Sequence, residues 1–203
     1  VELVEAIGVD PGATDFSAII RRLAAAKPQG IALITFSPQT ESLVKQAYDF
    51  GLTEPLFLAN YANSDPSLIE RGGAEAMEGF EAMAWLQVDF EDPDLPVWEI
   101  WRDHVGDPEA FPNAFVVGGM VAAEVFTEGL RRAGRDLTRE GLVAAMEGFD
   151  GWSGMLANDV RYGVQAEDTN NTSRLGKLSM YIMRVENGNF TIATDWIDFA
   201  PVE

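Results

Sequence analysis

Two successive strand-and-helix patterns constrain the fold of this chain more than any other feature. GIALIT, residues 30–35, is an almost unbroken apolar run, which is typical of a strand buried on both faces of a parallel sheet. A helix should follow at once, because Ser37 is a suitable cap, Pro38 suits the first helical position and Gly51 suits the end. Strands that alternate with helices predict a parallel sheet with right-handed crossovers.

The same alternation extends to both sides of this segment. Thr14 or Asp15 can cap a preceding helix by accepting its free amide hydrogens. The other predicted elements are strands at residues 1–9, 55–59 and 79–86, a helix at 16–24 and a short helix about Leu68. Residues 1 to about 88 therefore predict an α/β fold around a parallel sheet.

The composition changes after residue 88. DFEDPDLP, residues 89–96, is acidic and lacks periodicity, so we interpret it as a crossover between lobes. Helices are predicted at 97–105, 114–133 and 137–148, then a polar loop at 159–174 and a hairpin at 178–197 that turns at Asn187-Gly188. The middle helix is apolar on nearly every side in its first half, so it must pack against something large. We therefore expect these residues to be the C-terminal part of a longer chain.

Charge and composition exclude several classes of partner. The chain has 14 Lys and Arg against 33 Asp and Glu, a net charge of −19, which repels nucleic acid and anionic membranes. No apolar run approaches the ~20 residues of a membrane span, so we expect no stable membrane insertion. The absence of cysteine rules out disulfides and thiolate metal sites.

Candidate catalytic and metal-binding motifs all have a simpler explanation. The turn PGATD lacks the glycine spacing of a phosphate loop, and GWSGM has Met155 where a nucleophile elbow needs glycine. His104 lies among charged residues and is predicted to be on the surface. An acidic cluster lacks the glycine and the terminal glutamate of a calcium-binding loop; it comprises Asp89, Glu91, Asp92 and Asp94. We expect no enzyme activity, no metal and no cofactor.

The ends of the predicted strands supply candidate ligand contacts, because ligands of open α/β sheets bind beyond the carboxyl ends of the strands. Phe36 and Ser37 follow one strand, Asn60 and Tyr61 follow the next, and Glu78 stands just before the last. These groups suit a small zwitterionic or polar organic molecule with an apolar portion. The alternative, that Phe36 is a core residue and Tyr61 lies on a loop surface, is equally open.

Five segments of the chain, in order, resemble type I periplasmic binding proteins of branched-chain amino-acid ABC transporters. They are TDFSAIIRRLAAAKPQGIALI, SPQTESLVKQAYDFGL, MEGF, VAAEVFTEGLRRAGRDLTREGLVAAMEG and the ENGNF hairpin. The resemblance implies two lobes, each a parallel sheet flanked by helices, that close on a ligand. It assigns residues 1–91 to the second lobe, 92–177 to a helical segment of the first, and 178–203 to a hairpin that rejoins the second. The sheet of the first lobe would lie upstream of Val1.

The resemblance also implies a function. Such a protein is the extracytoplasmic substrate-binding component of an ABC importer, periplasmic or tethered outside the membrane, monomeric when intact, and a partner of permease subunits. Phe36 and Ser37 match an aromatic ligand contact, although they replace a tyrosine-rich pair, and Glu78 matches a glutamate that can face a ligand ammonium. The ligand stays open among branched-chain or related amino acids, aromatic acids and amides. A ligand-sensing regulatory domain of the same fold is the alternative.

Overall fold

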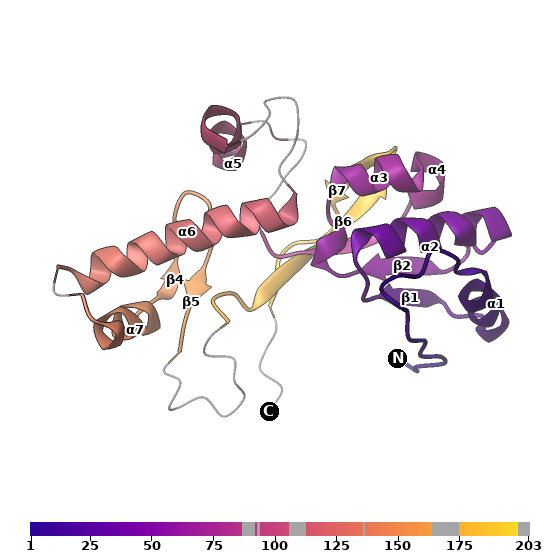
Figure 1. Ribbon diagram of the computed structural model, residues 1–203, viewed down its shortest axis with the longest axis horizontal. Coiled ribbons are helices and arrows are strands. Elements are labelled where there is room, and N and C mark those ends of the chain that lie inside the picture. The colour runs from indigo at the N-terminus through magenta and orange to yellow at the C-terminus, as the bar shows by residue number, and fades with distance from the viewer. Residues whose placement is uncertain (87–91, 93, 106–112, 136, 164–174, 199–203) are drawn as a thin grey trace. The chain divides into compact units, whose positions relative to one another are not determined.

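The structure, a computed structural model, divides into two compact units (Figure 1). It describes residues 1–86, 92, 94–105, 113–135, 137–163 and 175–198. Unit 1 comprises Val1–Ala84 and Tyr181–Asp195, and unit 2 comprises Trp85–Met180 and Trp196–Glu203.

Unit 1 is built on a sheet with the strand order β1-β2-β3-β6-β7. Its strands are β1 (Gly30–Leu33), β2 (Leu56–Ala59), β3 (Glu81–Ala84), β6 (Ser179–Glu186) and β7 (Asn189–Ile192). The first two residues of β6, Ser179 and Met180, belong to unit 2. Strands β1, β2 and β3 are parallel, whereas β6 is antiparallel to β3 and β7 is antiparallel to β6. The predicted α/β class with a parallel sheet is therefore confirmed.

The helices of unit 1 begin and end largely where the sequence predicts. They are α1 (Ser17–Ala26), α2 (Ser37–Phe50), the 3-10 turn η1 (Tyr61–Asn63), α3 (Pro66–Gly72) and α4 (Ala74–Met77). Asp15 Oδ1 accepts a hydrogen bond from Ser17 N at 2.9 Å, so Asp15 binds a free amide at the start of α1 as predicted, although the N-cap residue itself is Phe16. Gly51 ends α2 with a φ of 86°, a left-handed conformation that glycine adopts at little cost.

The core of unit 1 lies on one face of the sheet. The buried side chains on that face are Ile31, Leu33, Phe57, Ala59, Ala82, Met183, Val185 and Phe190, and α2 buries Leu43, Val44 and Ala47. On the opposite face, Ile34 is 87% exposed and Leu56 is 43% exposed. The prediction that β1 is buried on both faces is therefore wrong, since buried and exposed residues alternate along it.

The prediction of a strand at residues 1–9 is also wrong. Residues 1–15 have no regular secondary structure, and among the described residues β1 pairs only with β2. Leu3 and Val4 are exposed despite their apolar character. The apolar pattern of this segment suits a strand, but a strand forms only where a neighbour supplies hydrogen bonds.

Unit 2 consists mainly of helices. Its elements are α5 (Pro96–Ile100), the π-helical turn η2 (Trp101–Val105), α6 (Ala114–Ala133), α7 (Arg139–Glu147), β4 (Asp150–Trp152), β5 (Val160–Arg161) and β8 (Ile197–Asp198). The polar loop predicted from residue 159 begins instead with β5, which pairs with β4. The second strand of the predicted hairpin is in fact two strands, β7 and β8. Residues 89–91 and 93 of the acidic crossover lie outside the described residues.

Helix α6 is only partly covered by unit 2. Val117 and Val125 are buried in two small cores that include Trp98 and Phe149. Phe115, however, is 54% exposed and Phe126 is 51% exposed. The apolar composition of α6 predicts that the helix packs against something large. The part of unit 2 that the structure describes does not cover α6 on all sides. None of the described helices is long and apolar enough to cross a membrane.

Candidate functional site

The carboxyl ends of β1 and β2 bring together four of the five predicted ligand contacts. Because these strands are parallel, with Leu33 beside Ala59, their following loops leave the sheet at the same edge. Phe36 and Ser37 follow β1, and Asn60 and Tyr61 follow β2. The backbone N–H of Asn60 also donates to Leu33 O at 3.2 Å. We call these two loops, residues 34–37 and 60–65, the carboxyl rim.

Side-chain hydrogen bonds fix the two loops to each other. Ser37 Oγ donates to Ala62 O at 2.9 Å. Asn63 Nδ2 donates to Thr35 O and to Asn60 Oδ1, both at 2.9 Å. The rim is thus held by its own polar contacts, and a ligand would meet largely preformed loops.

Asn63 is a residue that the sequence analysis missed. It is fully buried, and its Oδ1 has no hydrogen-bond partner in the described structure. Thr40, also fully buried, shares a hydroxyl–hydroxyl hydrogen bond with Thr35 at 2.7 Å. Sequence alone offers no signal for either role, because Asn and Thr near loops usually indicate turns and caps.

Two aromatic side chains stand exposed on the carboxyl rim. Phe36 is 65% exposed, so the alternative that it is a core residue is wrong, and Tyr61 is 42% exposed. Phe36 also borders a hollow of about 760 Å³ that is lined mainly by apolar residues of the segment 1–11 and of β1. Exposed aromatic groups over a rigid loop are well placed to cover an apolar part of a ligand.

Asp65 is the only charged side chain of the carboxyl rim. Its Oδ1 accepts hydrogen bonds from Ser67 N at 2.9 Å and from Ser67 Oγ at 2.6 Å. This carboxylate therefore caps α3, which is the usual role of an aspartate at a helix start.

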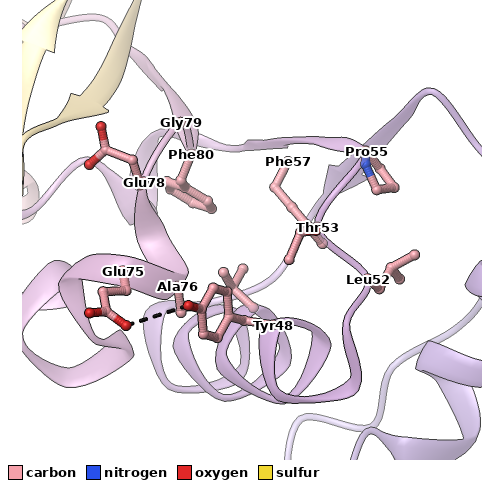
Figure 2. Close-up of a pocket in the computed structure, with 11 residues that line it drawn as sticks. Tyr48, Leu52, Thr53, Pro55, Phe57, Glu75, Ala76, Glu78, Gly79 and Phe80 are labelled. Carbon is pink, nitrogen blue, oxygen red and sulfur yellow. Dashed lines mark hydrogen bonds between the residues drawn. The ribbon is translucent and has the colours of Figure 1, made fainter.

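The structure does not bring Glu78 to the carboxyl rim. Glu78 precedes β3 and therefore lies at the amino ends of the parallel strands, where its Oε1 accepts a hydrogen bond from Asn187 N at 3.1 Å. Figure 2 shows it next to Gly79 and Phe80, at a cavity of about 100 Å³ that Tyr48 and Glu75 also line. The expectation failed because a residue before a strand and one after it lie at opposite edges of a parallel sheet.

The described residues hold no group of three or more His, Cys, Asp or Glu that could bind a metal ion. Asp89 and Glu91, two members of the acidic cluster considered in the sequence, lie outside these residues. His104 is exposed in η2, as predicted.

Comparison with known proteins identifies relatives for most of the chain. A sequence profile of the family described as periplasmic binding protein matches residues 1–189. No curated protein matches the sequence. Among solved structures, a branched-chain amino acid ABC transporter protein from Thermus thermophilus with bound valine is similar, at 24% identity and a TM-score of 0.75. The similarity covers 93% of this chain and 51% of that one.

Two further solved structures share the fold. A fatty acid ABC transporter substrate-binding protein from Thermomonospora curvata has 21% identity and a TM-score of 0.73, over 94% of this chain and 49% of its own. A solute-binding protein from R. palustris in complex with benzoate has 15% identity and a TM-score of 0.70, over 99% and 53%. The chain thus spans about half the length of the structures it matches.

Proposed function

Because the chain belongs to the periplasmic binding protein family, we propose that it is part of an extracytoplasmic solute-binding protein of an ABC importer. In this proposal the protein binds one small organic solute without changing it chemically, and permease subunits receive the solute. The protein is located in the periplasm, or it is extracellular and tethered to the membrane. Phe36, Ser37, Asn60 and Tyr61 are the ligand contacts that this chain contributes.

The exposure of Phe36 and Tyr61 on a rigid rim is the observation that supports this proposal most. Burying an aromatic side chain fully is worth roughly 1.5–3 kcal/mol. Since these two rings are already partly covered, a ligand that covers them would gain about 1–2 kcal/mol from each. The bonds donated by Ser37 and Asn63 hold the loops in place, so little of that gain is lost to ordering them.

We further propose that the two units belong to the two lobes of a clamshell. The predicted boundaries at residues 91 and 177 lie near two of the three positions where the chain passes between units, after Ala84 and after Met180; the third, after Asp195, was not predicted. In this proposal the ligand acts by making contacts that only the closed state of the whole protein offers, which shifts the equilibrium toward closure.

A thermal-shift screen tests the proposal, using branched-chain amino acids, aromatic acids, fatty acids and amides as probes. At least one class should raise the melting temperature, because a ligand that binds only the folded state stabilises it. For a probe that binds, Phe36→Ala and Tyr61→Ala should each weaken the affinity about tenfold. Phe50→Ala is the matched control, since Phe50 is similarly exposed, at 53%, but lies at the far end of α2.

Two results would contradict the proposal. One is the absence of any melting shift across all four classes of probe. The other is a loss of affinity in Phe50→Ala as large as the loss in Phe36→Ala, since a general loss of stability would then explain both.

A further inference from the structure

The hydrogen bonds of Asn60 limit which chemical group it can offer a ligand. Asn60 Oδ1 accepts from Ala62 N at 3.1 Å and from Asn63 Nδ2 at 2.9 Å. A carboxamide oxygen has two lone pairs, so both are already used. If the side-chain amide of Asn60 were flipped, its Nδ2 hydrogens would face the donors Ala62 N and Asn63 Nδ2. The orientation of the Asn60 amide is therefore fixed. The Nδ2 amide has no partner among the described residues, and Asn60 can therefore only donate to a ligand.

The rest of the carboxyl rim favours the same kind of ligand group. Helix α2 begins at Ser37 without a side-chain cap, so its N-terminal end adds a partial positive charge. Ser37 Oγ gives its proton to Ala62 O and keeps only a neutral acceptor site. The single carboxylate of the rim, Asp65, caps α3 through its Oδ1, which accepts both hydrogen bonds of Ser67. A ligand ammonium beside Asn60 and Ser37 would lose its hydration without gaining an ionic partner from either of these residues.

From these contacts we infer that the bound group facing Asn60 is a hydrogen-bond acceptor, a carboxylate or carboxamide, with no ammonium beside it. The ligand class is an alkyl or aryl carboxylic acid, or its amide, rather than an α-amino acid. Phe36 and Tyr61 cover its apolar portion. The inference rests on the proposed function and specifies the substrate class for the same site.

Isothermal titration calorimetry with two matched pairs of probes tests the inference. The pairs are L-leucine with 4-methylpentanoate and L-phenylalanine with 3-phenylpropanoate, and each differs only in the ammonium group. In at least one pair the acid without the ammonium should bind roughly tenfold or more tightly than the amino acid. If the amino acids bind as tightly or more tightly, the inference is overturned and the solute-binding function stands. If none of the four binds while a probe of another class in the thermal-shift screen does, the inference is overturned and the solute-binding function stands.

Asn60→Asp tests whether Asn60 causes the selectivity. Aspartate can still accept from Ala62 N and Asn63 Nδ2, so the loop should keep its structure, but it cannot donate and it repels a carboxylate. The acid probes should bind about tenfold or more weakly, and the preference over the amino acids should shrink or reverse. Asn189→Asp makes the same change at an exposed position on β7 and should leave the affinities unchanged. An unaltered preference in Asn60→Asp would overturn the inference.

Discussion

Glu124 of α6 holds the loop between β4 and β5 in unit 2. Its Oε1 accepts from Met155 N at 2.5 Å, and its Oε2 accepts from Leu156 N at 2.9 Å and Ala157 N at 2.8 Å. These donors are consecutive backbone amides, which would otherwise need water or another acceptor. We therefore expect Glu124→Ala to destabilise unit 2 more than an ordinary surface substitution.

The magnitude follows from the number and environment of these bonds. A hydrogen bond to a charged group contributes about 1.5–3 kcal/mol, but water can replace part of each contact in a loop that is partly exposed. Glu124→Ala should therefore cost about 2–4 kcal/mol in the free energy of unfolding. Glu124→Gln keeps one acceptor oxygen, which can serve Leu156 and Ala157, and turns its amide N–H groups toward Met155 N. It should cost about 1–2 kcal/mol.

Urea unfolding followed by tryptophan fluorescence measures this loss, because all five tryptophans lie in unit 2. With a slope of about 1.5 kcal/mol per molar urea, a cost of about 2–4 kcal/mol should lower the midpoint of Glu124→Ala by about 1–3 M. Glu140→Gln, at an exposed position in the first turn of α7, is the charge-matched control for Glu124→Gln and should change the midpoint little.

Gly154 supplies a second measure of the same contact. A β-carbon added at Gly154 would lie 2.5 Å from Glu124 Oε1, so Gly154→Ala should displace the carboxylate. Its cost should be much smaller in the Glu124→Ala background, which a double-mutant cycle reveals. The anchoring role of Glu124 would be refuted if the losses of stability in Gly154→Ala and Glu124→Ala simply added in the double variant. It would also be refuted if the urea midpoint of Glu124→Ala were close to that of Glu140→Gln.

Two further variants test the carboxyl rim and the surface of α6. Asn63→Ala should change the stability of unit 1 by no more than about 2 kcal/mol, yet reduce the preference for the acid probes. Hydrogen exchange of residues 30–65 and calorimetry measure these two effects, and an intact preference would contradict the prediction. Hydrogen bonds from Arg132, and then from Arg131, lower the pKa of Glu128 below its usual 4.5. This stabilisation is present above about pH 4.5 and is lost as the pH falls, so the urea midpoint should decline less toward about pH 3 in Glu128→Gln than in the parent. If the urea midpoints of the parent and of Glu128→Gln decline by the same amount as the pH falls, the stabilising role of the Glu128 carboxylate is contradicted.

The sequence predicted the elements whose signals are local. Helix α2 carries Pro38 in its first turn and Gly51 just after its end, and both act through their own backbone conformation. Helix α6 begins and ends at the predicted residues, 114 and 133. The predictions failed where pairing or covering elements decide the outcome. The mostly apolar pattern of residues 1–9 cannot show whether a neighbouring strand is available for pairing. The apolar run of β1 likewise cannot show whether other elements cover one face of the sheet or both.

The candidate site was predictable only in part, for a related reason. The parallel strand pattern indicated that the residues after β1 and β2 lie at one edge, and the structure brings them together. Glu78 was misplaced because its position before β3 puts it at the other edge, where it holds the turn at Asn187. The hydrogen bonds by which Asn63 joins the two loops could not be predicted from the sequence. Its partners, Thr35 O and Asn60 Oδ1, come within reach only when the two loops are side by side.

The opposing contributions of Asn63 explain why its effect should fall on selectivity rather than on stability. A buried acceptor without a partner costs about 1–3 kcal/mol, and Asn63 Oδ1 is such an atom. The bonds that its Nδ2 donates to Thr35 O and Asn60 Oδ1 contribute about 0.5–1.5 kcal/mol each, which offsets much of that cost. The net contribution of Asn63 to folding is therefore no more than about 2 kcal/mol in either direction. One of the two bonds, however, occupies the lone pair of Asn60 that a ligand donor would otherwise use. Removing Asn63 frees this lone pair while Ala62 N keeps Asn60 in its orientation, so Asn60 can then accept as well as donate. The rim should therefore discriminate less between an acid and an amino acid while the fold remains.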